Sequence, residues 1–145
     1  RIRKVFIIII YKESMAFGIY IISIIGLLLS VYAFFVEKNI KKSKSYKPLC
    51  DISNKVSCTK AFSSKYGSLA GISNSFAGIF FYSIVFFLAF FGQLNYIFYL
   101  AIISVIGSIY LAYTQITKIK SFCLVCSGIY LVNLLLLVFS YLELF

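Results

Sequence analysis

The chain carries the stretch Phe122-Cys123-Leu124-Val125-Cys126-Ser127-Gly128-Ile129-Tyr130 where its last apolar segment begins. That segment is long and apolar enough to cross a membrane. At about 100° per residue, Cys123, Cys126 and Tyr130 fall on one helical face. Thiols in a first turn face unpaired backbone N–H groups and the positive end of the helix dipole, which stabilise a thiolate. The stretch therefore predicts a reaction site, although it also fits two small apolar residues in a lipid-buried helix.

The composition indicates a polytopic membrane protein. The chain has 145 residues, of which 62% are apolar, and a mean hydropathy of +1.01, so we expect one membrane domain over 1–145. There is no His, and only four acids are present, which excludes His-based catalysis, carboxylate pairs and most metal sites. The net charge of +10 comes largely from lysines in one polar segment. We interpret them as a solvated loop over lipid headgroups and expect no nucleic-acid partner.

The apolar pattern predicts an all-α integral membrane fold, a four-transmembrane-helix bundle. The expected spans are 17–36, 75–91, 96–116 and 122–145, with a short apolar run at 5–11 lying in the membrane interface. The segment 37–73 is the only long loop. An even number of spans places both termini on one side, so the loop and the paired cysteines meet on the other.

The long loop contains the other two cysteines. Cys50 and Cys58 enclose seven residues, and the central Ser53-Asn54 favours a turn that can bring the two sulfurs within bonding distance. Ser57 is a candidate N-cap of a short helix over 58–66, with Ser73-Asn74-Ser75 capping the second span.

On that short helix, Cys58, Phe62 and Tyr66 share a face that would dock onto the mouth of the bundle. Four cysteines on one membrane face indicate two communicating pairs. A zinc site is disfavoured, because a C-x7-C spacing with the other pair at a lipid-buried helix end is poor zinc geometry.

The distribution of basic residues and the chemistry of the cysteines predict opposite orientations of the protein in the membrane. The loop and the 117–121 turn carry ten Lys, against four basic residues on the terminal side, so the positive-inside rule points the cysteines into the cytosol. A loop disulfide needs an oxidising compartment. We follow the chemistry and expect an extracytoplasmic loop, in a bacterial inner membrane or the endoplasmic reticulum membrane.

The ordered set of motifs resembles the vitamin K epoxide reductase (VKOR) family. The resemblance covers most of the chain and is far more specific than the cysteine pair alone. The matching stretches are Leu29-Ser30-Val31-Tyr32-Ala33, Leu49-Cys50-Asp51-Ile52, Ser57-Cys58-Thr59-Lys60-Ala61-Phe62-Ser63-Ser64-Lys65-Tyr66-Gly67, Asn74-Ser75-Phe76-Ala77-Gly78, Gly107-Ser108-Ile109-Tyr110-Leu111-Ala112 and Phe122-Cys123-Leu124-Val125-Cys126 followed by Tyr130.

The resemblance implies an enzyme that links protein thiols to a membrane quinone. It implies that Cys50 and Cys58 exchange electrons with a thioredoxin-like partner, that Cys58 passes them to Cys123, and that Cys126 acts on the quinone. The loop and its short helix would then cap a quinone pocket. The quinone, of vitamin K, menaquinone or ubiquinone type, or its epoxide, would be a substrate, with no tightly bound cofactor.

The resemblance also implies a set of pocket residues. Asn74 and Tyr130 match donors to the two quinone oxygens, and an apolar cavity with two donors suits a quinone that gains negative charge. Without the family match, Asn74 is more often a helix cap and Tyr130 an aromatic filler. The positions matching the loop helix and pocket wall are Phe62, Ser64, Tyr66, Phe81 and Leu111.

Two departures from animal members indicate a short, microbial type. Only 68–73 separates Gly67 from Asn74, where animal members carry a longer lid, and Tyr66 stands in place of Trp. We expect no fused thioredoxin-like domain, and therefore a separate thioredoxin-like partner. The electrons would serve either reduction of vitamin K or its epoxide, or disulfide formation. The alternative function is a non-catalytic four-span membrane scaffold with a disulfide-stapled loop.

Overall fold

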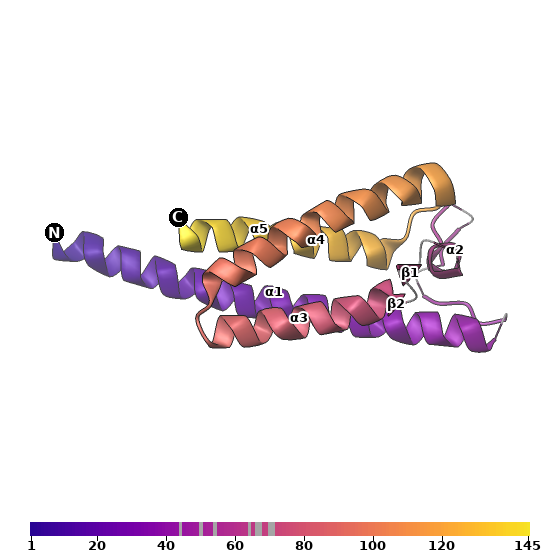
Figure 1. Ribbon diagram of the computed structural model, residues 1–145, viewed down its shortest axis with the longest axis horizontal. Helices are drawn as coiled ribbons and strands as arrows, with labels where there is room; N and C mark the ends of the chain where they lie inside the picture. Colours follow the sequence, from indigo (N-terminus) through magenta and orange to yellow (C-terminus); the bar gives the residue numbers. More distant parts are fainter. Residues whose placement is uncertain (44, 50, 54, 64, 66–67, 70–71) are drawn as a thin grey trace.

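Four long helices form an elongated bundle in the computed structural model, which describes residues 1–43, 45–49, 51–53, 55–63, 65, 68–69 and 72–145. Both termini lie toward one end of the bundle, and the small elements gather at the other (Figure 1). In chain order the elements are α1 (Ile2–Lys42), α2 (Cys58–Ser63), β1 (Ser68–Leu69), β2 (Ile72–Ser73), α3 (Asn74–Phe90), α4 (Leu94–Thr114), the π-helical turn η2 (Gln115–Ile119) and α5 (Leu124–Leu144).

The first helix differs most from the prediction. One continuous helix, α1, replaces the separate interface run at 5–11 and the span at 17–36, and it continues through Lys42. The predicted loop start at 37 is therefore wrong. The sequence 2–42 contains no proline, and the charged pair Lys12-Glu13 adds polarity without breaking a helix. At 1.5 Å per residue, α1 is about 60 Å long, roughly twice the thickness of a bilayer core.

Three of the described helices are long and apolar enough to cross a membrane: Ile2–Lys42, Leu94–Ile119 and Leu124–Leu144. α3 is a shorter apolar helix of 17 residues. Many of the large apolar side chains on these helices are exposed, including Ile103, Ile106 and Ile109 on one face of α4. The chain therefore has the character of a multi-pass, all-α membrane protein.

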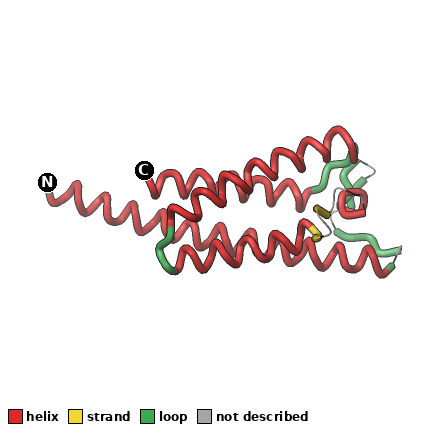
Figure 2. The backbone as a smooth tube through the Cα atoms, in the orientation of Figure 1, coloured by secondary structure: helices red, strands yellow, loops and turns green. Residues whose placement is uncertain are grey.

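The polar segment forms more structure than a single short helix (Figure 2). α2 begins at Cys58 as predicted, and the Ser57 hydroxyl accepts a hydrogen bond from the Lys60 N–H as its cap. β1 and β2 pair antiparallel, with Ser68 opposite Ser73, a hairpin that the all-α prediction did not include. Ser73 caps α3 by accepting from the Phe76 N–H, as predicted.

Two buried clusters hold the molecule together. The cluster in the middle of the bundle draws on all four long helices and comprises Ile19, Ile22, Tyr82, Val85, Ile97, Ala101, Val132 and Leu136. The cluster at the loop end joins α1 and α2 to the start of α5 and comprises Ala33, Val36, Cys58, Ala61, Phe62, Cys123 and Val125. Two of the four cysteines are therefore core residues of the second cluster.

A polar chain crosses the central cluster. The Tyr82 hydroxyl of α3 donates to the Asn133 side-chain oxygen of α5, and the Asn133 amide donates to the Ser108 hydroxyl of α4 at 2.7 Å. All three side chains are buried. Such bonds between membrane helices contribute on average about 0.6 kcal/mol each, and here they set the rotation of α5 relative to α3 and α4.

We expect Gly26→Ala to destabilise the bundle, because a Cβ on Gly26 would come within 2.4–2.6 Å of three atoms of the Tyr82 ring. That ring cannot move freely, since its hydroxyl is bonded to Asn133. The expected loss is about 1–3 kcal/mol, measured as a lowered melting temperature in detergent. Gly107→Ala is the matched control, because nothing lies within 4 Å of its Cβ position. Equal melting temperatures for the two variants would contradict this packing.

Candidate functional site

Two sulfur atoms meet where the loop touches the bundle. The Cys123 thiol donates toward the Cys58 Sγ at 3.3 Å, and both cysteines are 0% exposed. Cys58 is disulfide-bonded, while Cys123 and Cys126 are free thiols. Cys50, the predicted partner of Cys58, lies outside the described residues. A free thiol thus lies at the distance from a disulfide sulfur at which reacting atoms meet, about 3–3.5 Å.

A short backbone ladder brings these two cysteines together. Val56 forms an isolated parallel bridge with Phe122. The Ser57 N–H donates to the Phe122 carbonyl at 3.0 Å, and the Phe122 N–H donates to the Lys55 carbonyl at 2.6 Å. Cys58 lies two positions after Val56, and Cys123 lies one position after Phe122. The ladder therefore sets the distance between the two sulfurs.

Asp51 fixes the start of α2. Its carboxylate accepts from the Ser57 hydroxyl at 2.8 Å, the Thr59 hydroxyl at 2.5 Å and the Thr59 N–H at 3.2 Å. Burial raises the pKa of Asp51, but the hydrogen bonds from Thr59 and Ser57 outweigh it, and the net pKa lies below the usual 3.8. The charged form of Asp51 is therefore the form that holds Cys58 in position.

Cys123 is the N-cap of α5. Its sulfur accepts a hydrogen bond from the Cys126 N–H at 3.4 Å, in the place usually taken by a Ser or Asp oxygen. The pKa of Cys123 lies below that of an ordinary thiol, first because the Cys126 side chain hydrogen-bonds to it. The backbone N–H groups of Cys126 and Val125 lower it further, against burial and the charge of Asp51, which raise it. The prediction that the helix start favours a Cys123 thiolate is consistent with this geometry.

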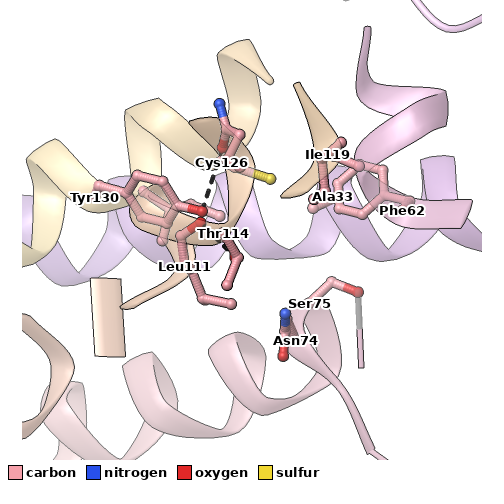
Figure 3. A pocket seen from close by; sticks show the side chains of 12 residues that line it. Ala33, Phe62, Asn74, Ser75, Leu111, Thr114, Ile119, Cys126 and Tyr130 are labelled. Atoms are coloured by element: carbon pink, nitrogen blue, oxygen red, sulfur yellow. Dashed lines mark hydrogen bonds between the residues drawn. The ribbon is translucent and has the colours of Figure 1, made fainter. Parts of the chain in front are cut away.

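An apolar cavity of about 90 Å³ lies directly beyond Cys126 (Figure 3). Cys126 and Tyr130 line it from α5, and Asn74 and Ser75 face them from the start of α3. The remaining lining comes from α1, α2, α4 and η2, and consists of Ala33, Ala61, Phe62, Leu111, Thr114, Gln115, Ile119 and, on α5, Ile129. The cavity is thus closed off by α2 on the side of the loop.

The residues predicted for the pocket are largely brought together. Cys126, Asn74, Tyr130, Phe62 and Leu111 all line the cavity. Phe81 is not among the described lining residues, because it turns toward the central cluster. Its ring packs edge-on against that of Tyr82, with the two ring centroids 5.1 Å apart. The predicted residues Ser64 and Tyr66 lie outside the described part of the chain.

Besides Ser75, two polar residues of the wall, Thr114 and Gln115, were not predicted as pocket residues. The Tyr130 hydroxyl donates to the Gln115 side-chain oxygen at 3.4 Å, and the adjacent Thr114 also lines the cavity. Both are buried. Gln115 is the last residue but one of the expected span 96–116, and an uncharged polar side chain within a span is itself a signal of function. The signal was present in the sequence, but only the π-helical turn shows that Gln115 faces Tyr130.

Comparison with known proteins supplies the classification. The family model described as the vitamin K epoxide reductase family matches residues 18–141. The chain belongs to this family. It is 33% identical over 132 residues to vitamin K epoxide reductase complex subunit 1 of Rattus norvegicus and 32% identical to the same subunit of Mus musculus. Each alignment covers 80% of this chain and 82% of the relative. This VKOR family member is accordingly a membrane oxidoreductase.

We expect the protection of α2 against hydrogen exchange to depend on the ionisation of Asp51. Because the folded pKa is depressed, the stabilisation is present above the unfolded value of 3.8 and is lost as pH falls through the folded pKa. Exchange of the 58–63 amides, corrected for its intrinsic pH dependence, should therefore be slower in wild type than in Asp51→Asn at pH 5.

At about pH 2 the two proteins should exchange alike, because Asp51 is then protonated. Thr59→Val provides a second variant, since it removes the shortest bond to Asp51 and keeps the carboxylate. A wild-type advantage that persists unchanged to pH 2 would show that the charge of Asp51 does not hold α2.

Proposed function

We propose that the protein passes electrons between a thioredoxin-like partner and a membrane quinone, through Cys50/Cys58 and then Cys123/Cys126. The observation that carries the proposal is the order of the sulfurs. Cys123 Sγ lies 3.3 Å from Cys58 Sγ, and Cys126, on the first turn of α5, lines the cavity. Cys123 thus lies next to Cys58, and Cys126 lies next to the proposed quinone site, in the order in which electrons would pass.

The inner transfer is a thiol–disulfide exchange between Cys58 and Cys123. Exchange proceeds by attack of a thiolate on a disulfide sulfur, and a lowered pKa raises the fraction of thiolate. For electrons moving toward the quinone, the reduced Cys58 attacks Cys123 of an inner Cys123–Cys126 disulfide, and Cys50 then displaces Cys123 from the mixed disulfide. The lowered pKa of Cys123 makes it a good leaving thiolate, and its sulfur lies 3.3 Å from that of Cys58. Because both sulfurs are fully buried, water and small oxidants have little access to a mixed disulfide formed between them. A partner protein would therefore act on the outer pair, with Cys50 as its point of entry.

The cavity suits the ring of a quinone. Its volume of about 90 Å³ is well below the roughly 300–1,000 Å³ of pockets that enclose a whole ligand, so we expect the isoprenoid tail to stay among the lipids. Asn74 and Tyr130 face each other across the cavity and would donate to the two ring oxygens. Tyr130 would turn its hydroxyl from Gln115 to the ligand. The quinone is a substrate here, with no tightly bound cofactor.

We further propose that all four long helices span the bilayer and that the loop end is extracytoplasmic. The three long apolar helices and the shorter α3 run side by side (Figure 1), and a thinner local bilayer or tilt of the others accommodates 17 residues. The disulfide at Cys58 favours the oxidising side of a bacterial inner membrane or of the endoplasmic reticulum. The lysines of this end would then contact lipid headgroups or the redox partner.

We expect Cys126→Ala to abolish quinone reduction with any reductant, because Cys126 is the thiol at the cavity. Cys58→Ala and Cys123→Ala should block turnover by a thioredoxin-like donor. Cys50→Ala should retain activity with dithiothreitol, since a small dithiol can attack the inner pair at the partly exposed Cys126 without the outer pair. The measurement is quinone absorbance with each donor.

Two outcomes would contradict this assignment. If Cys50→Ala were as inactive with dithiothreitol as Cys126→Ala, the order of transfers would be wrong. If serine at Cys123 or Cys126 left thiol oxidation unchanged, the protein would be a scaffold with a stapled loop and not an enzyme.

We expect Tyr130→Phe to lower quinone turnover by about tenfold or more, equivalent to roughly 1.4 kcal/mol. The hydroxyl is removed, while the ring still fills its place, so the melting temperature should change little. Asn74→Ala should cost at least as much. Leu111→Val, which trims the wall without removing a polar group, is the control. Wild-type turnover by Tyr130→Phe would identify Tyr130 as a packing residue.

A further inference from the structure

A buried carboxylate adjoins the cavity and has no part in the steps described above. Glu37 lies near the end of α1, and its side chain is 5% exposed. One carboxylate oxygen contacts the Lys41 ammonium at 3.0 Å, and the other accepts from the Ser75 hydroxyl at 2.6 Å. Ionisable groups buried in a membrane segment are costly and are usually functional. Glu37 therefore needs a reason to be there.

The contacts of Glu37 connect water to the cavity. On one side, the Lys41 side chain is 68% exposed. On the other, Ser75 lines the cavity beside Asn74 (Figure 3). The series Lys41, Glu37, Ser75 thus leads from the solvated end of α1 to the place proposed for a quinone oxygen, with a hydrogen bond at each step.

The chemistry of the cavity needs such a connection. Reduction of a quinone to a hydroquinone takes up two electrons and two protons. Oxidation of the Cys123/Cys126 dithiol to a disulfide supplies both electrons. The lowered pKa of Cys123 means that its proton is readily lost before the transfer. The quinone must then take its second proton from another source, because the Cys123 thiolate brings none to the cavity.

We propose that Glu37 carries a proton between water near Lys41 and the quinone cavity, through the hydroxyl of Ser75. This proposal rests on the proposed function. In each turnover the inner pair, reduced to a Cys123 thiolate and a Cys126 thiol, gives two electrons and the Cys126 proton to the quinone, while the second proton of the donor dithiol is released to water as the donor is oxidised. Glu37 takes up one proton from water, and Ser75 passes it to the second quinone oxygen. Two protons are released and two are taken up, so the reaction balances.

In this scheme Ser75 touches the substrate, and Glu37 acts through it. In the structure the Ser75 hydroxyl donates to the Glu37 carboxylate. Protonation of Glu37 reverses that bond, because a carboxylic acid can donate to the hydroxyl, whose own hydrogen is then directed elsewhere. Two directions are then open to it: the cavity, which Ser75 lines, and the Ser73 hydroxyl, whose oxygen lies 3.3 Å from that of Ser75. A purely bracing role, in which Glu37 only ties α1 to α3, is the competing explanation.

The test compares full-length wild type with Glu37→Gln, which keeps the size and the hydrogen bond to Ser75 but carries no acidic proton. The substrate is whichever of decylubiquinone and menadione the wild type reduces faster, with dithiothreitol as donor. We expect kcat to fall by about tenfold to a hundredfold, the range of a lost general acid, while KM for the quinone changes little. The slowing of kcat in D₂O should become larger than in wild type, and Glu37→Asp should recover part of the rate.

Two further variants separate the proton route from a brace. Lys42→Met removes a positive charge from the same exposed end of α1 without removing a contact of Glu37, so it should change kcat less than about twofold. Ser75→Ala cuts the route at its other link, and the double variant Glu37→Gln/Ser75→Ala should be no slower than the slower single one. Exchange between Cys58 and Cys123, followed without quinone by alkylation, should keep its wild-type rate in Glu37→Gln.

Wild-type kcat and D₂O effect in Glu37→Gln would overturn the proton route. A loss of kcat that follows a lower melting temperature, with Glu37→Asp no better than Glu37→Gln, would also overturn it in favour of a brace. Neither result would affect the proposed function, which fails only if the wild type does not reduce quinone or if Cys126→Ala is fully active.

Discussion

The two backbone hydrogen bonds between the loop and the start of α5 are the contact on which the site depends. Lys55 and Ser57 pair with Phe122, and this pairing lies between the predicted redox loop and the last helix. Two bonds contribute modestly to stability, about 0.5–1.5 kcal/mol each. Their importance is geometric, because they fix the cysteines that follow on each strand. Without them, the loop end would be a tethered peptide above an open bundle.

This contact matters chemically because the two cysteines that it brings together are buried. Cys58 and Cys123 belong to an apolar cluster with Val36, Ala61 and Phe62, so the sulfurs meet in a region without water. In that environment, the hydrogen bonds to the Cys123 sulfur stabilise its charge more strongly than they would in water. The same α2 that presents Cys58 also covers the cavity through Phe62. One short helix thus serves the exchange of thiols and the exclusion of water from the cavity.

Different contacts along the length of the bundle hold the cavity in place. The central cluster and the chain from Tyr82 through Asn133 to Ser108 fix the rotation of α5. Asn133 lies seven positions beyond Cys126, two helical turns along α5, so this rotation also decides where Cys126 and Tyr130 point. Near the mouth, Glu37 and Ser75 join α1 to α3. These polar contacts adjoin or orient the site, whereas the Tyr20 hydroxyl of α1, which donates to the Ala89 carbonyl of α3 at 2.9 Å, braces the opposite end of the bundle.

The sequence by itself determined the membrane character, the helical order and the shared location of Cys58, Cys123 and Cys126, while the family resemblance named five of the twelve described residues that line the cavity. The first three follow from local rules: apolar length, caps at Ser57 and Ser73, and the helical spacing of Cys123, Cys126 and Tyr130. Only the tertiary structure decided that α1 is one helix from Ile2 to Lys42, that Phe81 faces the central cluster, and that Gln115 and Ser75 face the cavity. The side toward which a residue points in an all-apolar helix carries no local signal, because every face is hydrophobic. Contacts between elements distant in the sequence, such as Glu37 with Ser75, depend on how the helices pack, and no single stretch of the chain encodes them.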